Sequence, residues 1–284
     1  MSTKIHLTAA LPTWENRDII WLQLESLCRQ ETNLNWELIV CEEQTAAKLS
    51  NSSYIPGEGI IFSKGQMVPT MLGEADLLKW TDRLTAAGCK RIKYIPLDER
   101  IPLSKKWWLM GQHALGSSFA LCAADDYSSP DRFELSHEKI SEGYDWFNVK
   151  RGMFLNLQTW VTTTFVAENE KRGLTMCANT EKIKNIIGDH WPTYSVDGWL
   201  QQKMSKFYQH KDNVAGLDTD GANKICGNRR KQYSANSYRV THQFGVPVQN
   251  FFPPEQEVED ILPTSVIERL KKQDFTSTSV KFLN

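Results

Sequence analysis

The fold is decided by the stretch Leu121-Cys122-Ala123-Ala124-Asp125-Asp126-Tyr127-Ser128-Ser129-Pro130-Asp131-Arg132. The apolar run over residues 119–124 predicts a buried strand, and the Ser-Ser-Pro turn opens a polar helix. Asp125 and Asp126 stand at the carboxyl end of that strand. Buried acids are costly unless something positive binds them, and ligands of open α/β sheets sit at this end of the strands. The pair indicates either a divalent cation that holds a phosphorylated ligand or acids that stabilise a helix N-terminus.

Strands and helices alternate on the N-terminal side of this stretch. Apolar runs at 5–11, 36–41 and 91–95 predict buried strands; the segment 12–17 breaks the first, and the second ends in two acids. Helices are predicted from Asn16 as N-cap through residue 27, over 74–87, and from Ser104 as cap through residue 113. Residues 46–73 are polar and glycine-rich, with one short strand at 60–62. The alternation predicts a doubly wound, mostly parallel sheet with helices on both faces.

The C-terminal side continues the mixed pattern. Helices are predicted over 134–142, 180–187, 196–207 and 264–272, a strand over 146–149, and further sheet over 153–166. No internal repeat and no linker divides the chain. A single domain is therefore expected.

Composition narrows the class of protein. The 284 residues carry a formal net charge of −1, with 40% apolar and 24% charged residues, which is typical of a globular protein. Any contact with nucleic acid must therefore be local. Six cysteines lie far apart without a CxxC pair, which favours free thiols and a cytoplasmic location. No apolar run reaches membrane-spanning length, so no integral membrane contact is expected.

Four motifs in order resemble glycosyltransferase family 2 and its relatives with the GT-A fold. They are Leu11-Pro12-Thr13-Trp14-Glu15-Asn16-Arg17, Val40-Cys41-Glu42-Glu43, Ala124-Asp125-Asp126 with Pro130-Asp131-Arg132, and Val196-Asp197-Gly198-Trp199-Leu200. The resemblance covers about the first two hundred residues. It implies a GT-A, Rossmann-like sheet flanked by helices, with a smaller acceptor-side region. Within one domain, residues 1–130 would bind the nucleotide sugar, and residues 131–284 would hold the acceptor and the catalytic group.

The resemblance also implies roles for individual residues. It assigns nucleotide contacts to Pro12, Thr13, Trp14, Arg17, Glu42, Glu43, Lys106 and Asp125, with a UDP-sugar as the expected donor. Lys106 would face the phosphates, and Glu42 or Glu43 would touch the base, where the family carries Asp. The open alternative for Lys105 and Lys106 is a solvated helix face.

The implied chemistry is metal-dependent glycosyl transfer. Asp125 and Asp126 resemble the family's metal pair for Mn²⁺ or Mg²⁺, hard cations that prefer oxygen ligands, with His242 as a candidate third ligand. Asp197 falls where the family places its general base, which takes the proton of the acceptor hydroxyl and would give inversion. The alternative for Asp197 is a cap on the helix that follows it.

The acceptor is suggested by a basic and aromatic segment at 224–239. Arg229, Arg230, Lys231 and Tyr233 suit a phosphate backbone and a stacked base. The enzyme could therefore glycosylate hydroxymethylated bases in DNA, as some bacteriophage enzymes do, in which case it would act in the host cytoplasm. A surface glycan is the alternative acceptor, with these cations on the donor diphosphate or in solvent.

Two other functions compete with glycosyl transfer. A nucleotidyltransferase that makes sugar nucleotides would carry a glycine-rich loop after the first strand, and the segment 12–17 has no glycine. A non-catalytic sugar- or nucleotide-binding module would have no need of Asp197.

Overall fold

The computed structural model describes most of the sheet and helix framework of the chain. The described residues are 4–13, 19–43, 52–55, 59–62, 67–68, 74–99, 101–124, 126–149, 151–156, 160, 162–166, 174–186, 191–192, 196–204, 207–210, 225–228, 251–252 and 258–272.

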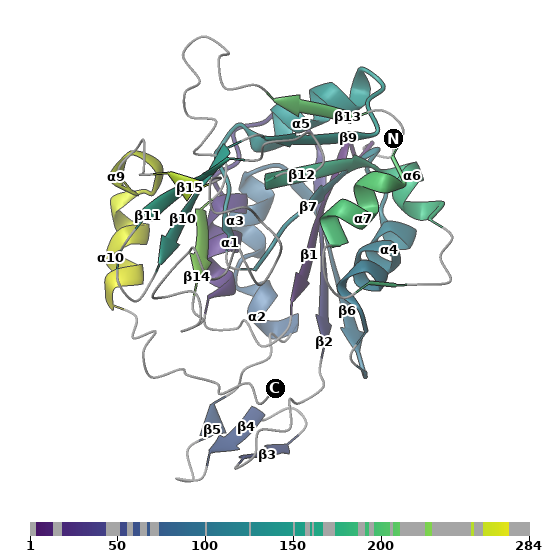
Figure 1. Cartoon of the computed structure of the whole chain (residues 1–284). Helices are drawn as coiled ribbons and strands as arrows, with labels where there is room; N and C mark the ends of the chain where they lie inside the picture. Colours follow the sequence, from purple (N-terminus) through teal and green to yellow (C-terminus); the bar gives the residue numbers. More distant parts are fainter. Residues whose placement is uncertain are drawn as a thin grey trace.

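A seven-stranded sheet forms the centre of the molecule (Figure 1), with the order β13-β9-β12-β7-β1-β2-β6. The strands are β1 (Leu7–Thr13), β2 (Trp36–Glu43), β6 (Cys89–Leu97), β7 (Ser118–Leu121), β9 (Trp146–Val149), β12 (Leu174–Asn179) and β13 (Phe207–His210). β1 pairs in parallel with both β2 and β7, and β2 pairs in parallel with β6. Only β12 runs antiparallel to its neighbours in this sheet. The predicted mostly parallel, doubly wound sheet is confirmed.

Helices cover both faces of this sheet (Figure 1). The helices α1 (Ile20–Leu27), α3 (Thr81–Ala86) and α5 (Arg132–Ser141) pack on one face, and α4 (Leu103–His113), α6 (Thr180–Lys184) and α7 (Val196–Gln202) pack on the other. Side chains of β1 alternate between the two cores, since Leu7, Ala9 and Leu11 face the first and Ala10 faces the second. This period of two leaves the strand buried on both faces, as a central parallel strand requires.

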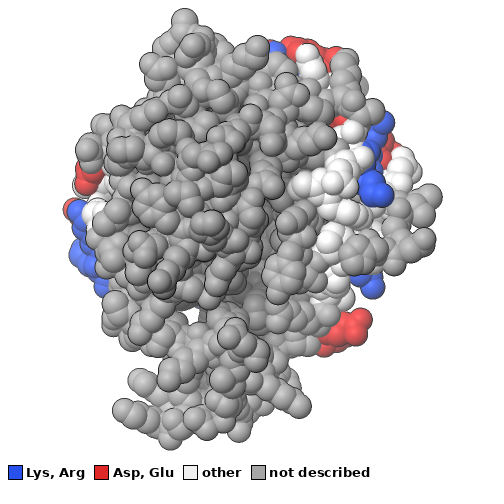
Figure 2. Space-filling view, viewed as in Figure 1, with Lys and Arg blue, Asp and Glu red and all other residues white. Residues whose placement is uncertain are grey.

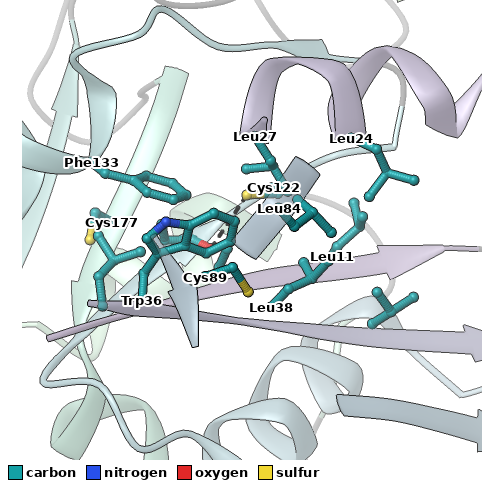
Figure 3. Packing of buried hydrophobic residues seen from close by; sticks show 14 of the residues in the cluster. Leu11, Leu24, Leu27, Trp36, Leu38, Leu84, Cys89, Cys122, Phe133 and Cys177 are labelled. Carbon is teal, nitrogen blue, oxygen red and sulfur yellow. Dashed lines mark hydrogen bonds between the residues drawn. The ribbon is translucent and has the colours of Figure 1, made fainter. Parts of the chain in front are cut away.

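The core under α1 and α5 is built around two aromatic rings. Trp36 and Phe133 meet edge to face, with ring centroids 5.1 Å apart and an interplanar angle of 72° (Figure 3). Both side chains have zero exposure. The indole Nε1 of Trp36 donates to the main-chain oxygen of Ala87 at 2.7 Å, so its polar atom is satisfied inside the core.

A smaller sheet lies beside the central one, with the order β15-β11-β10-β14-β8. Its strands are β8 (Asp126–Tyr127), β10 (Arg151–Asn156), β11 (Thr162–Val166), β14 (Ile225–Asn228) and β15 (Phe251–Phe252). A separate three-stranded antiparallel sheet contains β3 (Ser52–Ile55), β4 (Gly59–Phe62) and β5 (Met67–Val68), and α2 (Glu74–Leu78) follows it. The polar segment at 46–73 thus holds more sheet than the single predicted strand.

Two C-terminal helices close the fold over α1. These are α9 (Val258–Ile261) and α10 (Thr264–Lys272), and α10 spans the residues predicted. Val266, Ile267 and Leu270 of α10 pack with Trp21 of α1 in a third apolar cluster, while the guanidinium of Arg269 lies 3.9 Å from the Trp21 ring centroid. Lys and Arg side chains gather over α10 at the left rim of Figure 2. Of the helices in the described ranges, none has the length and apolar character needed to cross a bilayer.

The described cysteines agree with the predicted free thiols. Cys28, Cys41, Cys89, Cys122 and Cys177 form no disulfide. Burial raises the pKa of Cys177 to about 12, so this thiol stays protonated and unreactive.

The structure corrects several predicted boundaries. β1 runs through Pro12 and Thr13, where the sequence predicted a break. The pairing of β1 with β7 ends at Ala10, two residues before Pro12, while Pro12 still pairs with Cys41 of β2. A proline is tolerated there because no strand needs its missing N–H. The strand that precedes the paired acids, β7, ends earlier than predicted, at Leu121.

Two predicted helices also differ from the structure. The single helix predicted over 196–207 is α7, ending at Gln202, followed by the strand β13 from Phe207. The helix predicted over 74–87 is divided into α2 and α3.

The predicted cap of α4 is also wrong. Ser104 does not cap α4, which has Pro102 as N-cap residue. The Ser104 hydroxyl instead donates to the main-chain oxygen of Pro192 at 2.7 Å.

A buried carboxylate joins the central strands near their amino-terminal ends, opposite the carboxyl ends where the paired acids follow. Glu37 of β2 has zero exposure, and its Oε1 accepts from the Thr8 hydroxyl and the Leu115 N–H, both at 2.6 Å. Its Oε2 accepts from Arg91 of β6 at 2.6 Å. The turn into β7 passes so close that a Cβ on Gly116 would lie 2.5 Å from the main chain of β1, which only glycine avoids.

Loss of this carboxylate should destabilise the whole sheet. Glu37→Ala leaves buried donors of β1 and of the turn into β7 without their acceptor. Each such donor costs about 1–3 kcal/mol, so the free energy of unfolding should fall by about 3–5 kcal/mol. Urea denaturation measures this change. The matched control is Glu181→Ala, since this ion-paired glutamate has a side chain that is 71% exposed and should cost less than about 1 kcal/mol. Equal stability of the two variants would contradict the role of Glu37.

Candidate active site

Three parallel strands end at the same edge of the central sheet. Thr13 at the end of β1 lies opposite Glu42 of β2, and Ala10 lies opposite Leu121, the last residue of β7. The chain leaves β7 still bonded to β1, because the Cys122 N–H donates to the Ala10 oxygen at 2.8 Å. The structure thus brings the first three sequence motifs to one edge, where open α/β sheets bind ligands.

Lys106 reaches this edge from α4. Its ammonium donates to the main-chain oxygen of Thr13 at 3.1 Å, and the residue is only 4% exposed. The solvated-face interpretation is therefore wrong for Lys106, although its neighbour Lys105 is partly exposed. The Thr13 hydroxyl is buried and makes no hydrogen bond with any described residue. The Lys106 ammonium and the Thr13 hydroxyl therefore both lie at the end of β1.

The two acids that end β2 lie inside the strand. Glu42 has zero exposure, and its backbone pairs with Thr13 on one side and Pro96 on the other. Glu43 ends β2, and its side chain lies outside the description. A buried carboxyl group therefore stands next to Thr13, at the strand end that Lys106 reaches.

The acidic loop, residues 122–131, connects the two sheets. The Asp126 N–H donates to the Ala123 oxygen at 3.3 Å, and Asp126 and Tyr127 then form β8, which pairs with Cys226 and Ile225 of β14. Asp126 is 5% exposed. Burial raises the pKa of Tyr127 to about 12, so this neighbouring phenol stays protonated.

The alternative in which the acids cap a helix fails for Asp126. The helix α5 begins at Arg132 with Asp131 at the N-cap position, and no side-chain hydrogen bond caps it. Asp126 instead forms part of the strand β8. Asp125 lies outside the described residues.

Asp197 lies in the first turn of α7. Val196 and Leu200 of this helix are buried in the cluster that contains Cys41 and Trp107, which packs α7 against α4. The side chain of Asp197 lies outside the description, so its role as general base stays a prediction.

The remaining predicted site residues lie outside the described part of the chain. These are Trp14, Arg17, Arg229, Arg230, Lys231, Tyr233 and His242. Along the chain, Arg229 to Lys231 follow β14 directly, and β14 pairs with the strand of Asp126. Within the described ranges, no group of three or more His, Cys, Asp or Glu residues could hold a metal ion.

The sequence interpretation assigned no role to two buried polar residues that touch the acidic loop. Gln23 of α1 has zero exposure, and Arg132 of α5 is 3% exposed. A glutamine inside the apolar run Ile20-Trp21-Leu22-Gln23-Leu24 was the available signal, since a buried polar side chain needs a hydrogen-bonding partner.

Comparisons with solved structures agree with this architecture. Residues 1–349 of S. aureus TarS in complex with UDP-GlcNAc match with a TM-score of 0.51 and 14% identity over 93% of this chain and 72% of that chain. The mannosyltransferase PcManGT from Pyrobaculum calidifontis, in complex with GDP-Man and Mn²⁺, matches with a TM-score of 0.50 and 11% identity over 85% of this chain and 61% of that chain. The chain has the GT-A fold.

The GT-A fold implied by the sequence motifs is therefore confirmed. This chain spans 41% of the longer TarS chain that it also matches. No protein-family model and no curated protein sequence matches it. At such low identities the similarity defines the fold, and the chemistry has to be argued from the residues at the strand ends.

Lys106 should stabilise the end of β1 through its bond to Thr13. Lys106→Met removes the donor from a buried carbonyl, so the free energy of unfolding should fall by about 1–3 kcal/mol. The neighbouring Lys105→Met is the matched control and should stay within about 0.5 kcal/mol of the parent protein. Urea denaturation of both variants measures the difference, and equal stabilities would contradict the proposed bond.

Proposed function

We propose that this chain is a glycosyltransferase that moves a sugar from a nucleotide-sugar donor to a hydroxyl acceptor. The observation that carries the proposal is the meeting of β1, β2 and the acidic loop at one edge of a GT-A sheet. A donor nucleotide at this edge would lie against Pro12, Thr13 and the acids of β2. Residues 1–130 would bind the donor, and residues 131–284 would hold the acceptor.

The donor is inferred from the strand-end chemistry and from the structural neighbours. Lys106 brings a buried cation to the end of β1, which would favour an anionic diphosphate nearby. TarS and PcManGT were solved with UDP-GlcNAc and GDP-Man. A nucleotide diphosphate sugar, with UDP as the expected nucleotide, is the donor class that fits.

We also propose a divalent cation, Mn²⁺ or Mg²⁺, at the acidic loop. Asp126 supplies a buried carboxylate there, and carboxylate oxygens are the ligands that these hard cations prefer. Asp125, its neighbour in sequence, would be the second ligand and His242 a third. A bound cation would neutralise the charge that develops on the leaving diphosphate.

Asp197 is the proposed general base. A carboxylate in the first turn of α7 would take the proton of the acceptor hydroxyl, which makes the oxygen a better nucleophile. Attack opposite the leaving diphosphate would invert the anomeric configuration, through an oxocarbenium-like state.

The acceptor is proposed from the segment after β14. Because Cys226 pairs with Asp126, a strand rise of about 3.3 Å per residue brings the chain out of β14 close to the acidic loop. In the sequence, Arg229, Arg230 and Lys231 follow β14 directly, and Tyr233 comes shortly after them. These residues suit a hydroxymethylated base in DNA, and a surface glycan is the alternative acceptor.

A thermal-shift panel of nucleotide sugars with and without Mn²⁺ tests the donor and the metal together. The matching donor should raise the melting temperature, and at about 100 times its Kd it stabilises the protein by about 2.7 kcal/mol. Asp126→Ala should abolish the Mn²⁺-dependent part, whereas Asp82→Ala, on the exposed side of α3, should retain it. Asp197→Asn should keep the donor shift and lose transfer.

A different result would contradict the proposed metal, the proposed general base and the proposed donor. Full transfer in EDTA would remove the metal, and transfer retained in Asp197→Asn would remove the base. A panel in which no nucleotide sugar shifts the melting temperature would remove the donor class and with it glycosyl transfer.

Charge reversal in the segment after β14 tests the DNA acceptor. If DNA binds there, Arg229→Glu with Arg230→Glu should weaken binding and flatten the plot of log Kobs against log salt by about 0.9 for each phosphate that the protein no longer neutralises. Lys90→Glu, exposed on β6, is the control and should leave the slope unchanged. Transfer to an oligosaccharide by a protein that does not bind DNA would favour the glycan instead.

A further inference from the structure

The amide of Gln23 bonds to the main chain of the acidic loop. Two carbonyl oxygens face the end of this side chain, and only its nitrogen can bond to both. Nε2 therefore donates to the oxygen of Asp126 at 3.0 Å and to that of Ala123 at 3.1 Å, while Oε1 faces the Ser26 hydroxyl at 3.1 Å. These two bonds hold the loop at positions that flank Asp125 in the sequence.

Arg132 holds the same loop from the α5 side. Its guanidinium donates to the Ser128 hydroxyl at 2.8 Å and to the main-chain oxygens of Leu121 at 2.7 Å and Met176 at 3.3 Å. The first two contacts join the end of β7 to the far side of the acidic loop, and the third joins both to β12.

The charge of Arg132 is informative because, among the described residues, its guanidinium has only neutral hydrogen-bond partners. The partners of its guanidinium within the described residues are carbonyls, a hydroxyl and the Cys122 sulfur, and the residue is 3% exposed. An isolated buried cation is costly, and a neutral side chain could make similar hydrogen bonds. A nearby negative charge would offset this cost, and the acidic loop that Arg132 contacts through Cys122 and Ser128 carries two adjacent acidic residues.

The helix that carries Gln23 is itself firmly anchored. Leu24 and Leu27 point from α1 into the core above the sheet (Figure 3). Glu25 ties α1 to α3 through Arg83 at 2.8 Å and also pairs with Arg29 at 2.9 Å. Burial opposes ionisation of Glu25, but hydrogen bonds from the two arginines hold its pKa below the ordinary value. Gln23 therefore extends from a fixed support.

We propose that Gln23 and Arg132 are positioning residues that hold the acidic loop in its metal-binding geometry before the cation arrives. Two adjacent carboxylates repel each other, which would favour relaxation of an unsupported loop. Gln23 fixes the backbone at Ala123 and Asp126, and Arg132 holds Ser128 and the end of β7 while bringing a positive charge to the loop. The bonds from Gln23 are made to main-chain oxygens, not to the carboxylates that would bind the cation. This inference rests on the proposed metal site.

Direct Mn²⁺ binding in the presence of UDP tests the proposal without requiring transfer. The full-length protein is titrated with Mn²⁺ at fixed UDP, and the free ion is followed by electron paramagnetic resonance. Gln23→Met keeps the length of the side chain and removes its donors, so the apparent Mn²⁺ Kd should rise about tenfold, as for other supporting residues of metal sites. Arg132→Met should act in the same direction, and Arg132→Lys should recover part of the affinity because it keeps the charge.

Gln30→Met separates loop positioning from general stability. Gln30 lies just after α1 and donates to the Ser129 oxygen at the far end of the loop at 2.7 Å, and it accepts from the Phe133 N–H of α5 at 3.1 Å. Its replacement should lower the melting temperature and change the Mn²⁺ Kd less than twofold. Unchanged Mn²⁺ affinity in Gln23→Met, or an equal loss in Gln30→Met, would overturn the proposal. Failure of the parent protein to bind Mn²⁺ would instead remove the metal site itself.

Discussion

The buried carboxylate of Glu37 is the constraint on which the central sheet depends. It accepts hydrogen bonds from β1, from the turn into β7 and from Arg91 of β6, and so joins consecutive strands of a parallel sheet at one end. Parallel strands are distant in sequence and need such tertiary ties to fix their register. With the register set at this end, the opposite ends of β1, β2 and β7 meet, and the candidate active site lies there.

At the candidate site, buried polar side chains donate hydrogen bonds mainly to main-chain carbonyl oxygens. Lys106 donates to a carbonyl of β1, Gln23 donates to two carbonyls of the acidic loop, and Arg132 donates to carbonyls of β7 and β12. Backbone atoms are held by these bonds whatever ligand the acids bind. Such an arrangement suits a site that must accept a charged ligand without reorganisation, because preorganised groups do not have to be reordered at the moment of binding.

Local patterns in the sequence predicted much of the framework. The strand at 146–149 and the helix at 264–272 were predicted with the bounds that the structure has. The helix repeats apolar residues at helical spacing, and the strand is a short run rich in aromatic and β-branched residues. Pro12 shows why other boundaries failed: a proline ends a strand only where its missing N–H is needed, and the early end of β7 removes that need. The helix predicted over 196–207 runs too far, into Phe207 at the start of β13, because β13 pairs with β9, which is distant in sequence.

The sequence by itself determined the class of sheet, the order of the motifs and the presence of paired acids after a buried strand. These features depend on the spacing of apolar residues and on residues that are close together in the sequence, so the sequence alone is sufficient to predict them. Only the tertiary structure decided that Lys106 is buried at the end of β1, that Asp126 joins a second sheet, and that Gln23 and Arg132 support the acidic loop. These contacts join residues far apart in the chain, and hydrogen-bond partners at such separation are set by packing rather than by local sequence.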